Sequence, residues 1–331
     1  MKDLLTALFD HHTLSRPEAH ALMLRLGEGE VTDAAAAALL TVYRMRPITV
    51  PELAGFRDAL LELCRDPELG THEVLDIVGT GGDGKATLNI STLASFVVAG
   101  AGYKVAKHGN FGVSSPVGSS NVLAYFGYEF DAGPDRLRRQ LDAAGICFLH
   151  APAFHPAMRR LAPVRRDLGV RTFFNMLGPL INPARPAAQL LGVYSLELLR
   201  LYQYLLEDAG TRYAVVHALD GYDELSLTGE AKIATSAEGE QLLTASALGL
   251  PVCQARELAG GDTVEASARL FRDVLDGKGT RAQCDVVAAN AALGIRCADP
   301  AISLADALES AYDSLDSGRA RRAFIGLLNT Q

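Results

Sequence analysis

The sequence contains no tryptophan, few cysteines and no long apolar run. Its five cysteines are widely spaced and form no C-x-x-C pair; they are Cys64, Cys147, Cys253, Cys284 and Cys297. This spacing speaks against the common zinc sites and favours reduced thiols in a cytosolic protein. The first residues, MKDLLTALFDHH, carry acids and histidines, so we expect neither a signal peptide nor a membrane span. A cytoplasmic protein with no membrane partner is therefore expected.

The chain also has fewer basic than acidic side chains, with 31 Lys and Arg against 39 Asp and Glu and a net charge of −8. Nucleic-acid binding depends on neutralising phosphates with Lys and Arg, so we expect no nucleic-acid partner. A local basic pocket for a small anion stays compatible with this balance. With 331 residues, 49% of them hydrophobic and 21% charged, the chain predicts a globular protein of about two domains.

Residues 1–66 have the pattern of helices throughout. Ser15–Glu18 and Thr49–Glu52 each fit the capping box, and residues 34–46 form a strongly helical run that ends before a proline. No strand-like segment interrupts them. We therefore predict a small helical domain over residues 1–70.

From residue 73 onward, short β-rich runs alternate with helical patterns. The predicted strands are residues 73–78, 103–107, 146–150, 190–195 and 213–218. This alternation predicts an α/β domain over residues 71–331, with a mostly parallel central sheet flanked by helices. A hairpin-like stretch follows at residues 225–244, and some helices of this part could pack on the N-terminal domain.

Residues 79–87, GTGGDGKAT, match two phosphate-binding motifs and follow a predicted strand. Both G-x-G-x-x-G and G-x-x-x-x-G-K fit the run. A triphosphate loop needs Ser or Thr after the lysine, but the next residue is Ala86. A dinucleotide site needs an acid about 20 residues later, whereas the second strand ends in Lys107 and His108. The run alone leaves an anion site and a ligand-free turn open.

A second polar loop lies beside the first. Asn89, Ser91 and Thr92 begin the helix after the glycine run, and a Gly/Ser-rich loop leads from His108 to a helix start at Ser119. Helix starts bind anions, and the carboxyl ends of parallel strands meet at one edge of a sheet. Two such loops predict a ligand with two separated phosphate groups.

The order of GTGGDG, NIST, KVAKHGN and GSSNVL resembles the anthranilate phosphoribosyltransferase family of tryptophan biosynthesis. The resemblance continues through residues 155–184, 220–229, 260–262 and 290–292, so it spans nearly the whole chain. It implies a fold of helical plus α/β domains, shared with the nucleoside phosphorylases. It also implies transfer of the phosphoribosyl group of phosphoribosyl pyrophosphate (PRPP) to anthranilate, the second step from chorismate to tryptophan. The two phosphate groups of PRPP correspond to the two loops.

The resemblance also implies which residues bind PRPP. By similarity these are Gly79, Gly82, Asp83, Thr87, Asn89, Ile90, Ser91, Thr92, Lys107, His108, Gly109, Asn110, Phe111, Gly112, Val113, Ser114, Ser115 and Ser119.

For anthranilate, the implied residues are Gly79, Asn110 and Arg165, the last with a planar fork suited to a carboxylate. His155 is a further candidate near the aromatic substrate. No catalytic base is expected, because the amine of anthranilate is neutral at pH 7. Lys107 and His108 are candidates for stabilising the substrate.

For magnesium, the implied ligands are Ser91, Asp223 and Glu224, which would hold two ions on the pyrophosphate. Adjacent acids after a strand suit a hard cation through oxygen ligands. Taken alone, such a pair is more often a solvated turn. The family resemblance also implies a homodimer paired through the helical domain.

The second loop departs from the family pattern. The family commonly reads KHGNRSVSSKSGS, and this chain reads KHGNFGVSSPVGS. Phe111, Gly112, Pro116 and Val117 thus replace two cations and two serines. We expect the chemistry to be kept while PRPP affinity, loop closure or access of the second substrate differs.

Three other functions stay open from the sequence. The first is a phosphoribosyltransferase for another aromatic amine. The second is a pyrimidine nucleoside phosphorylase, whose loop carries a K-x-S-x-R-type motif in place of KHGN and the acidic pair. The third is a non-catalytic nucleic-acid-binding relative, which the net charge of −8 disfavours.

Overall fold

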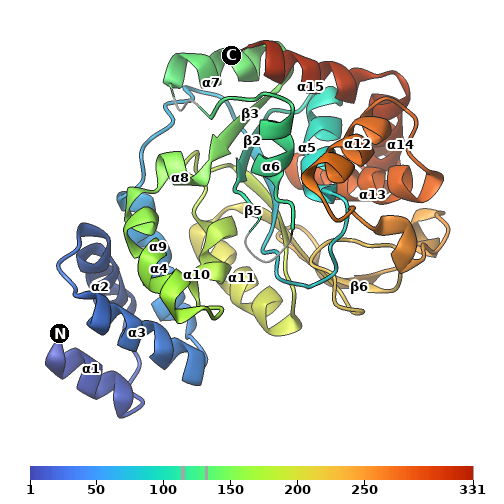
Figure 1. Cartoon of the computed structure of the whole chain (residues 1–331). Coiled ribbons are helices and arrows are strands. Elements are labelled where there is room, and N and C mark those ends of the chain that lie inside the picture. The colour runs from blue at the N-terminus through green and yellow to red at the C-terminus, as the bar shows by residue number, and fades with distance from the viewer. Residues whose placement is uncertain (113–115, 131–132, 331) are drawn as a thin grey trace. The chain divides into compact units, whose positions relative to one another are not determined.

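The computed structural model describes residues 1–112, 116–130 and 133–330, and the chain forms two compact units (Figure 1). Unit 1 comprises Met1–Asp66 and Ala151–Pro183, and unit 2 comprises Pro67–His150 and Ala184–Gln331. The units do not follow chain order, because the segment between the third and fourth strands belongs to the unit of the N-terminal helices. Each unit is described by itself.

Unit 1 is helical. Its helices are α1 (Lys2–Phe9), α2 (Arg16–Glu28), α3 (Asp33–Met45), α4 (Val50–Glu62), α8 (Ala151–Phe154), α9 (Pro156–Leu168), α10 (Phe174–Leu177) and the 3-10 turn η1 (Gly178–Leu180). Both predicted capping boxes are present, with the Ser15 and Thr49 side chains accepting from the backbone N–H groups of Glu18 and Glu52. Helices α2 and α4 pack together, and α9 packs on α2 and α3.

A buried aromatic group holds the centre of unit 1. The ring of Phe56 stacks on that of Phe173 at 4.8 Å, and the Tyr43 ring meets both edge-on at 5.4 and 5.1 Å. Phe173 comes from the second chain segment, so burial of these rings joins residues 151–183 to the N-terminal helices.

Unit 2 is built on a seven-stranded sheet of order β3-β2-β1-β4-β5-β6-β7. The strands are β1 (Leu75–Gly79), β2 (Val105–Gly109), β3 (Ile146–His150), β4 (Ala188–Gly192), β5 (Arg212–Ala218), β6 (Ala231–Thr235) and β7 (Gly239–Leu243). Strands β1 to β5 are parallel, and β6 and β7 form an antiparallel hairpin beside β5. The predicted parallel sheet and hairpin are thereby confirmed.

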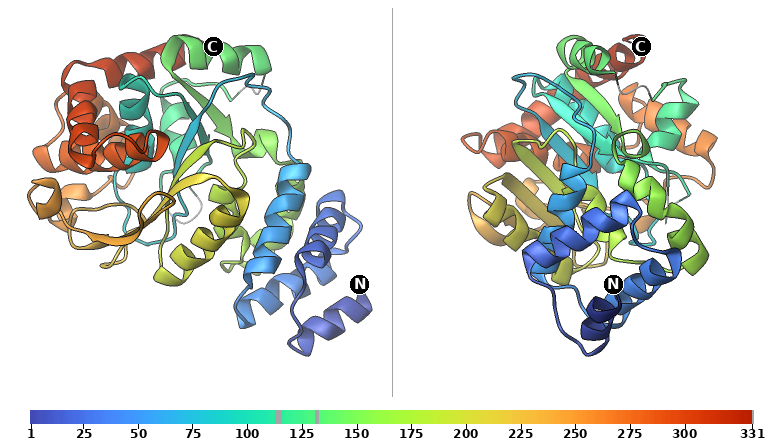
Figure 2. Two further views of the ribbon diagram at one scale, coloured as in Figure 1. Left: turned by 180° about the vertical axis from the view of Figure 1, so that it is seen from behind. Right: turned by 90° about the vertical axis from the view of Figure 1, so that its left-hand side faces the viewer.

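Helices enclose this sheet. They are α5 (Ile90–Gly100), α6 (Ser119–Tyr125), α7 (Pro134–Ala144), α11 (Leu196–Ala209), α12 (Val264–Leu275), α13 (Arg281–Ala298), α14 (Leu304–Asp316) and α15 (Arg319–Asn329), with 3-10 turns η2 (Ser246–Leu248) and η3 (Ala255–Leu258). Helix α5 packs on β1 and β2 and against α13, α14 and α15 (Figure 2), and its residues other than Ser91 and Gly100 are buried. An apolar helix of this kind belongs in a core, and the first polar loop leads directly into it.

Among the described residues, no helix combines the length and the apolar character needed to cross a membrane.

Candidate active site

The predicted site of unit 2 gathers where β1 and β4 end. Gly79 ends β1 and pairs with Gly192, which ends β4. The Asp223–Glu224 segment follows β5, the neighbouring parallel strand. The carboxyl ends of these strands lie at one edge of the sheet, as expected for a ligand site in a parallel sheet.

The acidic pair is hydrogen-bonded to the glycine run and to the start of α5. The Asp223 carboxylate accepts a hydrogen bond from the N–H of Gly81 at 2.6 Å. The Glu224 carboxylate accepts one from the N–H of Ser91 at 2.9 Å, at the start of α5. Segments more than 130 residues apart in sequence are therefore assembled into one site.

Two glycines make room for this arrangement. A Cβ atom on Gly79 would lie 2.5 Å from the Asp223 carboxylate, and one on Gly192 would lie 1.6 Å from the Asp223 carbonyl oxygen. Any side chain at Gly192 would displace the backbone of Asp223. Gly192 was not among the predicted site residues, because its need for glycine arises only from the chain that packs over it.

The glycine run itself requires positive φ angles. Gly81, Gly82 and Gly84 have φ of +64°, +82° and +75°, a region that glycine occupies without strain. Ala86 shares this conformation at +50°. The backbone N–H of Lys85 donates a hydrogen bond to the Asp83 carboxylate at 3.0 Å.

A second segment supports the far end of this run. Thr87 forms an isolated antiparallel bridge with Ala259, and the N–H of Gly260 donates to the carbonyl of Ala86 at 2.9 Å. A Cβ on Gly260 would lie 2.2 Å from the Thr87 carbonyl oxygen. The GGD motif at residues 260–262 therefore has a structural reason: Gly260 allows close approach to the end of the glycine run.

Burial shapes the charges of the site. Asp223 is only 7% exposed, and burial together with the neighbouring Asp83 charge raises the pKa of its carboxyl. Burial and the Asp223 charge likewise raise the pKa of Glu224. A buried carboxyl beside a partly buried one is costly to ionise unless a cation neutralises the pair.

Lys107 supplies a buried cation nearby. Its side chain is 2% exposed, and its ammonium donates to the Ile77 carbonyl of β1 at 2.6 Å. Burial lowers the pKa of Lys107 to about 8, although the Asp76 and Glu224 charges oppose that shift. The adjacent His108 is also buried, and its backbone N–H donates to Asp76 at 3.1 Å.

Hydrogen bonds join the two ends of the second loop to each other and to the start of α6. The side-chain oxygen of Asn121 accepts from the N–H groups of Gly112 and Gly118, at 2.9 Å each. The Asn110 carbonyl accepts from the N–H of Ser120 at 3.1 Å and from the Ser119 hydroxyl at 3.4 Å. Asn121 was not predicted as part of the site. The predicted PRPP residues Val113, Ser114 and Ser115 lie outside the described residues.

In unit 1, only one arginine of the stretch RRLAPVRRD is partly buried. Arg165 lies on α9 with its guanidinium 5.2 Å from the Phe174 ring, and burial lowers its pKa. Arg159, Arg160 and Arg166 are exposed. The sequence alone could not distinguish these four, and burial now sets Arg165 apart.

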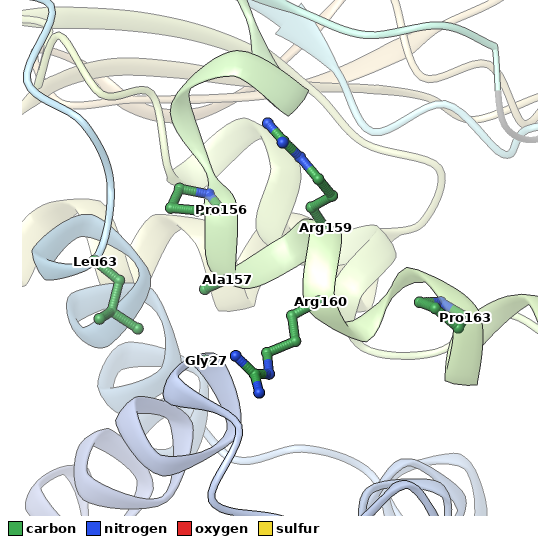
Figure 3. A pocket seen from close by; sticks show the side chains of 7 residues that line it. All are labelled: Gly27, Leu63, Pro156, Ala157, Arg159, Arg160 and Pro163. Carbon is green, nitrogen blue, oxygen red and sulfur yellow. The ribbon is translucent and has the colours of Figure 1, made fainter.

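A surface hollow in unit 1 contains none of the predicted site residues. It lies between α9 and the C-terminal ends of α2 and α4, and Arg159 and Arg160 extend from α9 in different directions beside it (Figure 3). The predicted His155 is buried just before α9, and burial lowers its pKa to about 4. A neutral buried histidine suits packing better than proton transfer at pH 7.

Comparisons with known proteins agree with this arrangement. Residues 2–64 match the glycosyl transferase family, helical bundle domain, and residues 71–321 match its a/b domain. An anthranilate phosphoribosyltransferase of Cytophaga hutchinsonii is 54% identical over 98% of both chains. The chain belongs to the anthranilate phosphoribosyltransferase family. The members of this family are pentosyltransferases.

Solved structures of family members share the fold. The anthranilate phosphoribosyltransferase of Thermus thermophilus superposes with a TM-score of 0.92, with 39% identity over 98% of both chains. The Saccharomyces cerevisiae enzyme in complex with PRPP and Mg superposes with a TM-score of 0.87, with 26% identity over 96% of this chain and 93% of that one. The same yeast enzyme has also been solved with 4-fluoroanthranilate. None of the three alternative functions is favoured by these comparisons.

The acidic pair fits the magnesium expected for an anthranilate phosphoribosyltransferase. In the part of the chain that the structure describes, no three His, Cys, Asp or Glu side chains gather as a complete metal site. Magnesium usually takes one or two carboxylates and completes its shell with water and substrate phosphates. Buried Asp223 and partly buried Glu224, both with raised pKa values, offer such an incomplete set of hard oxygen ligands.

Proposed function

We propose that this chain transfers the 5-phosphoribosyl group of PRPP to the amino group of anthranilate and releases pyrophosphate, with magnesium as cofactor. This is the second step from chorismate to tryptophan. The observation that carries the proposal is the pair of hydrogen bonds that join Asp223 and Glu224 to the glycine run and to the start of α5. They unite the proposed metal ligands with the proposed phosphate-binding backbone in one edge of the sheet.

PRPP would be bound by the two loops of unit 2. The proposed residues within the described part of the chain are Gly79, Gly82, Asp83, Thr87, Asn89, Ile90, Ser91, Thr92, Lys107, His108, Gly109, Asn110, Phe111, Gly112 and Ser119. Positive φ angles in the first loop and the N-terminus of α5 support this set, because such backbone directs N–H groups toward anions. Two of these groups, the N–H of Gly81 and of Ser91, already donate to the carboxylates of Asp223 and Glu224.

Magnesium would be held by Asp223 and Glu224 with Ser91, as two ions per subunit on the pyrophosphate. Bound there, it would neutralise the charge that develops on the leaving pyrophosphate. Backbone N–H groups of the first loop would add to this stabilisation, and those of Gly81 and Lys85 would first have to leave the Asp223 and Asp83 carboxylates to which they donate. Lys107 would contribute positive charge from beneath the loop, since its ammonium is buried against β1.

Anthranilate would be bound by Gly79, Asn110 and Arg165, with Arg165 paired to the carboxylate. Its neutral amine would attack the anomeric carbon on the face opposite the leaving group and invert that carbon. No side chain needs to remove a proton before the attack. His108 would then help to bind the substrate, without acting as a base.

The proposal includes a homodimer in the cytoplasm, with a helical part up to about residue 70 that provides the pairing surface. The five cysteines are all free, which fits a reducing compartment. Sedimentation of the purified protein would test the dimer, because a monomer at micromolar concentration would contradict it.

The activity can be tested by following anthranilate fluorescence with purified protein, PRPP and magnesium. We expect consumption that requires both, and a loss of about 100-fold in Asp223→Asn, as for the loss of one preorganised electrostatic group. Glu230→Gln is the matched control, because Glu230 is an exposed acid a few residues further along the chain. PRPP binding without anthranilate consumption would reject anthranilate as the acceptor and direct the assay to other aromatic amines.

A further inference from the structure

A residue of α13 also fixes the backbone next to the acidic pair. Asn290 lies on α13, is 4% exposed, and faces the residue directly after Glu224. Its side-chain oxygen accepts from the N–H of Leu225 at 3.1 Å, and its amide donates to the carbonyl of Leu225 at 2.8 Å. The same amide group also donates to the carbonyl of Val286 at 2.8 Å, within α13.

This contact replaces the strand pairing that the segment lacks. Residues 223–228 belong to no helix or strand, and their buried backbone groups still need hydrogen-bond partners. Leu227 is fully buried with a φ of +59°, a conformation that a leucine adopts only when its surroundings enforce it. The carbonyl of Leu227 accepts from the N–H of Cys253 at 2.9 Å, so a second fixed point lies two residues beyond Leu225.

The residue type at position 290 is also informative. Most of α13 is buried and apolar, and asparagine is a poor residue for a helix interior. A carboxamide can donate and accept at once, whereas an aspartate at this position could only accept. Both capacities of Asn290 are used on Leu225.

We propose that Asn290 is a positioning residue that fixes Asp223 and Glu224 for binding of the divalent cation. Through Leu225 it sets where the Glu224 carboxylate meets the N–H of Ser91. Without it, the backbone of residues 223–225 shifts and the two carboxylates no longer share one cation. The inference rests on the proposed role of the acidic pair in metal binding.

The first test compares Asn290→Asp with the native enzyme in steady-state assays over a range of magnesium concentrations. Asn290→Asp keeps the acceptor and loses both donated bonds. We expect the magnesium concentration for half-maximal activity to rise about 10- to 100-fold, as for other residues that orient metal ligands. The KM for anthranilate should stay within about twofold, since substrate contacts are untouched.

Ser314→Ala is the matched control. It removes another buried side-chain bond, from the Ser314 hydroxyl to the Val97 carbonyl at 2.7 Å, which lies in a later turn of α5 than Ser91 and makes no direct contact with the acidic pair. We expect it to lower the melting temperature without changing the magnesium requirement. If Asn290→Asp behaves like Ser314→Ala, Asn290 is only structural and the proposal is overturned.

The second test uses amide hydrogen exchange of the magnesium-free protein and is independent of activity. Asn290→Asp should speed exchange at Ser91, whose N–H is bonded to Glu224, while the N–H of Leu225 keeps its acceptor. If Asn290→Asp exchanges faster than the native protein only in the turn of α13 around Val286, the proposal is overturned. Asn290→Ser serves both tests if Asn290→Asp does not fold. Failure of the native enzyme to consume anthranilate would reject the function, while the exchange result would still decide the role of Asn290.

Discussion

Gly192 lacks a side chain, and the backbone of Asp223 occupies the space that one would need. A Cβ atom there would lie 1.6 Å from the Asp223 carbonyl oxygen, which is backbone and cannot rotate away. The position thus couples the end of β4 to the geometry of the acidic pair. Its importance comes from contact with a segment about 30 residues further along the chain, and no local motif marks it.

We expect Gly192→Ala to abolish most activity and to destabilise the protein by at least about 1–3 kcal/mol, the usual cost of overpacking a core. Thermal melting and the anthranilate assay together measure both effects. Gly178→Ala is the control, because a Cβ at Gly178 meets no atom within 4 Å and the residue has a right-handed helical conformation. Full activity of Gly192→Ala would contradict the role assigned to this glycine.

At single positions, the sequence predicted side chains better than contacts. The first loop could be named from its glycine motif, whereas Asp223 and Glu224 required the family resemblance, and the structure brings them together. Arg165 could be chosen only through resemblance, because its distinction from three neighbouring arginines is burial. Asn290, Asn121 and Gly192 act through the backbone of distant segments, and sequence spacing carries no signal for that.

Among the elements, the strands and the capped helices were the most predictable. Short β-rich runs identified β1 to β5, and the two capping boxes identified the starts of α2 and α4. Boundaries were less certain, since β1 was expected at residues 73–78 and spans Leu75–Gly79. Its last residue depends on pairing with Gly192 rather than on local preference.

The second loop, which departs from the family pattern, is supported by aromatic contacts. Phe111 packs edge-on against the rings of Phe130 and His150, with centroids 5.8 and 5.0 Å apart. His150 stacks on Phe130 at 4.3 Å and is bonded to the Ser120 hydroxyl at 2.9 Å. These contacts anchor the start of the loop on β3, while Pro116 near its end is exposed and uncharged.

We expect Pro116→Lys to lower the KM for PRPP up to about fivefold, because an exposed charge pair contributes roughly 0.2–1 kcal/mol. The KM for anthranilate should not change. Pro116→Ala separates the added charge from the loss of the proline ring, and raised salt should weaken the gain. Equal PRPP affinity in all three proteins would show that the missing charge has no effect.

In the whole molecule, the two units depend on different interactions. Unit 2 has a layered apolar core, whereas unit 1 contains a buried ionic centre at Glu52, which is 0% exposed. Arg46 donates to this carboxylate at 2.6 and 3.0 Å, and the Tyr43 hydroxyl and Leu14 N–H each donate at 3.0 Å. Burial alone would raise the pKa of Glu52, but the bonds from Arg46, Thr49 and Leu14 outweigh it and lower the pKa.

We expect Glu52→Gln to destabilise unit 1 by about 3–5 kcal/mol at pH 7, since it leaves Arg46 without its buried partner. A lowered native pKa means that Glu52 stabilises the fold above its unfolded pKa of about 4.3. That contribution is lost as the pH falls through the native value, so the difference between native protein and variant should shrink below pH 4.

Hydrogen exchange of α2 to α4 measures this better than one melting curve, because two units need not unfold together. Glu62→Gln is the control, since Glu62 is an exposed acid paired with His20 and should change stability little. A constant difference between native protein and Glu52→Gln from pH 7 to pH 3 would disagree with a buried ionised Glu52.

The interrupted path of the chain through unit 1 also affects how the protein is made. On the ribosome, α1 to α4 emerge first, but their partner α9 lies beyond Ala151, after the first three strands of the sheet. At roughly 5–20 residues per second, the N-terminal helices wait on the order of ten seconds for it. During that interval the apolar faces of α2 and α3 that α9 later covers are open to chaperones, so slow codons between residues 66 and 151 would lengthen the most vulnerable stage of synthesis.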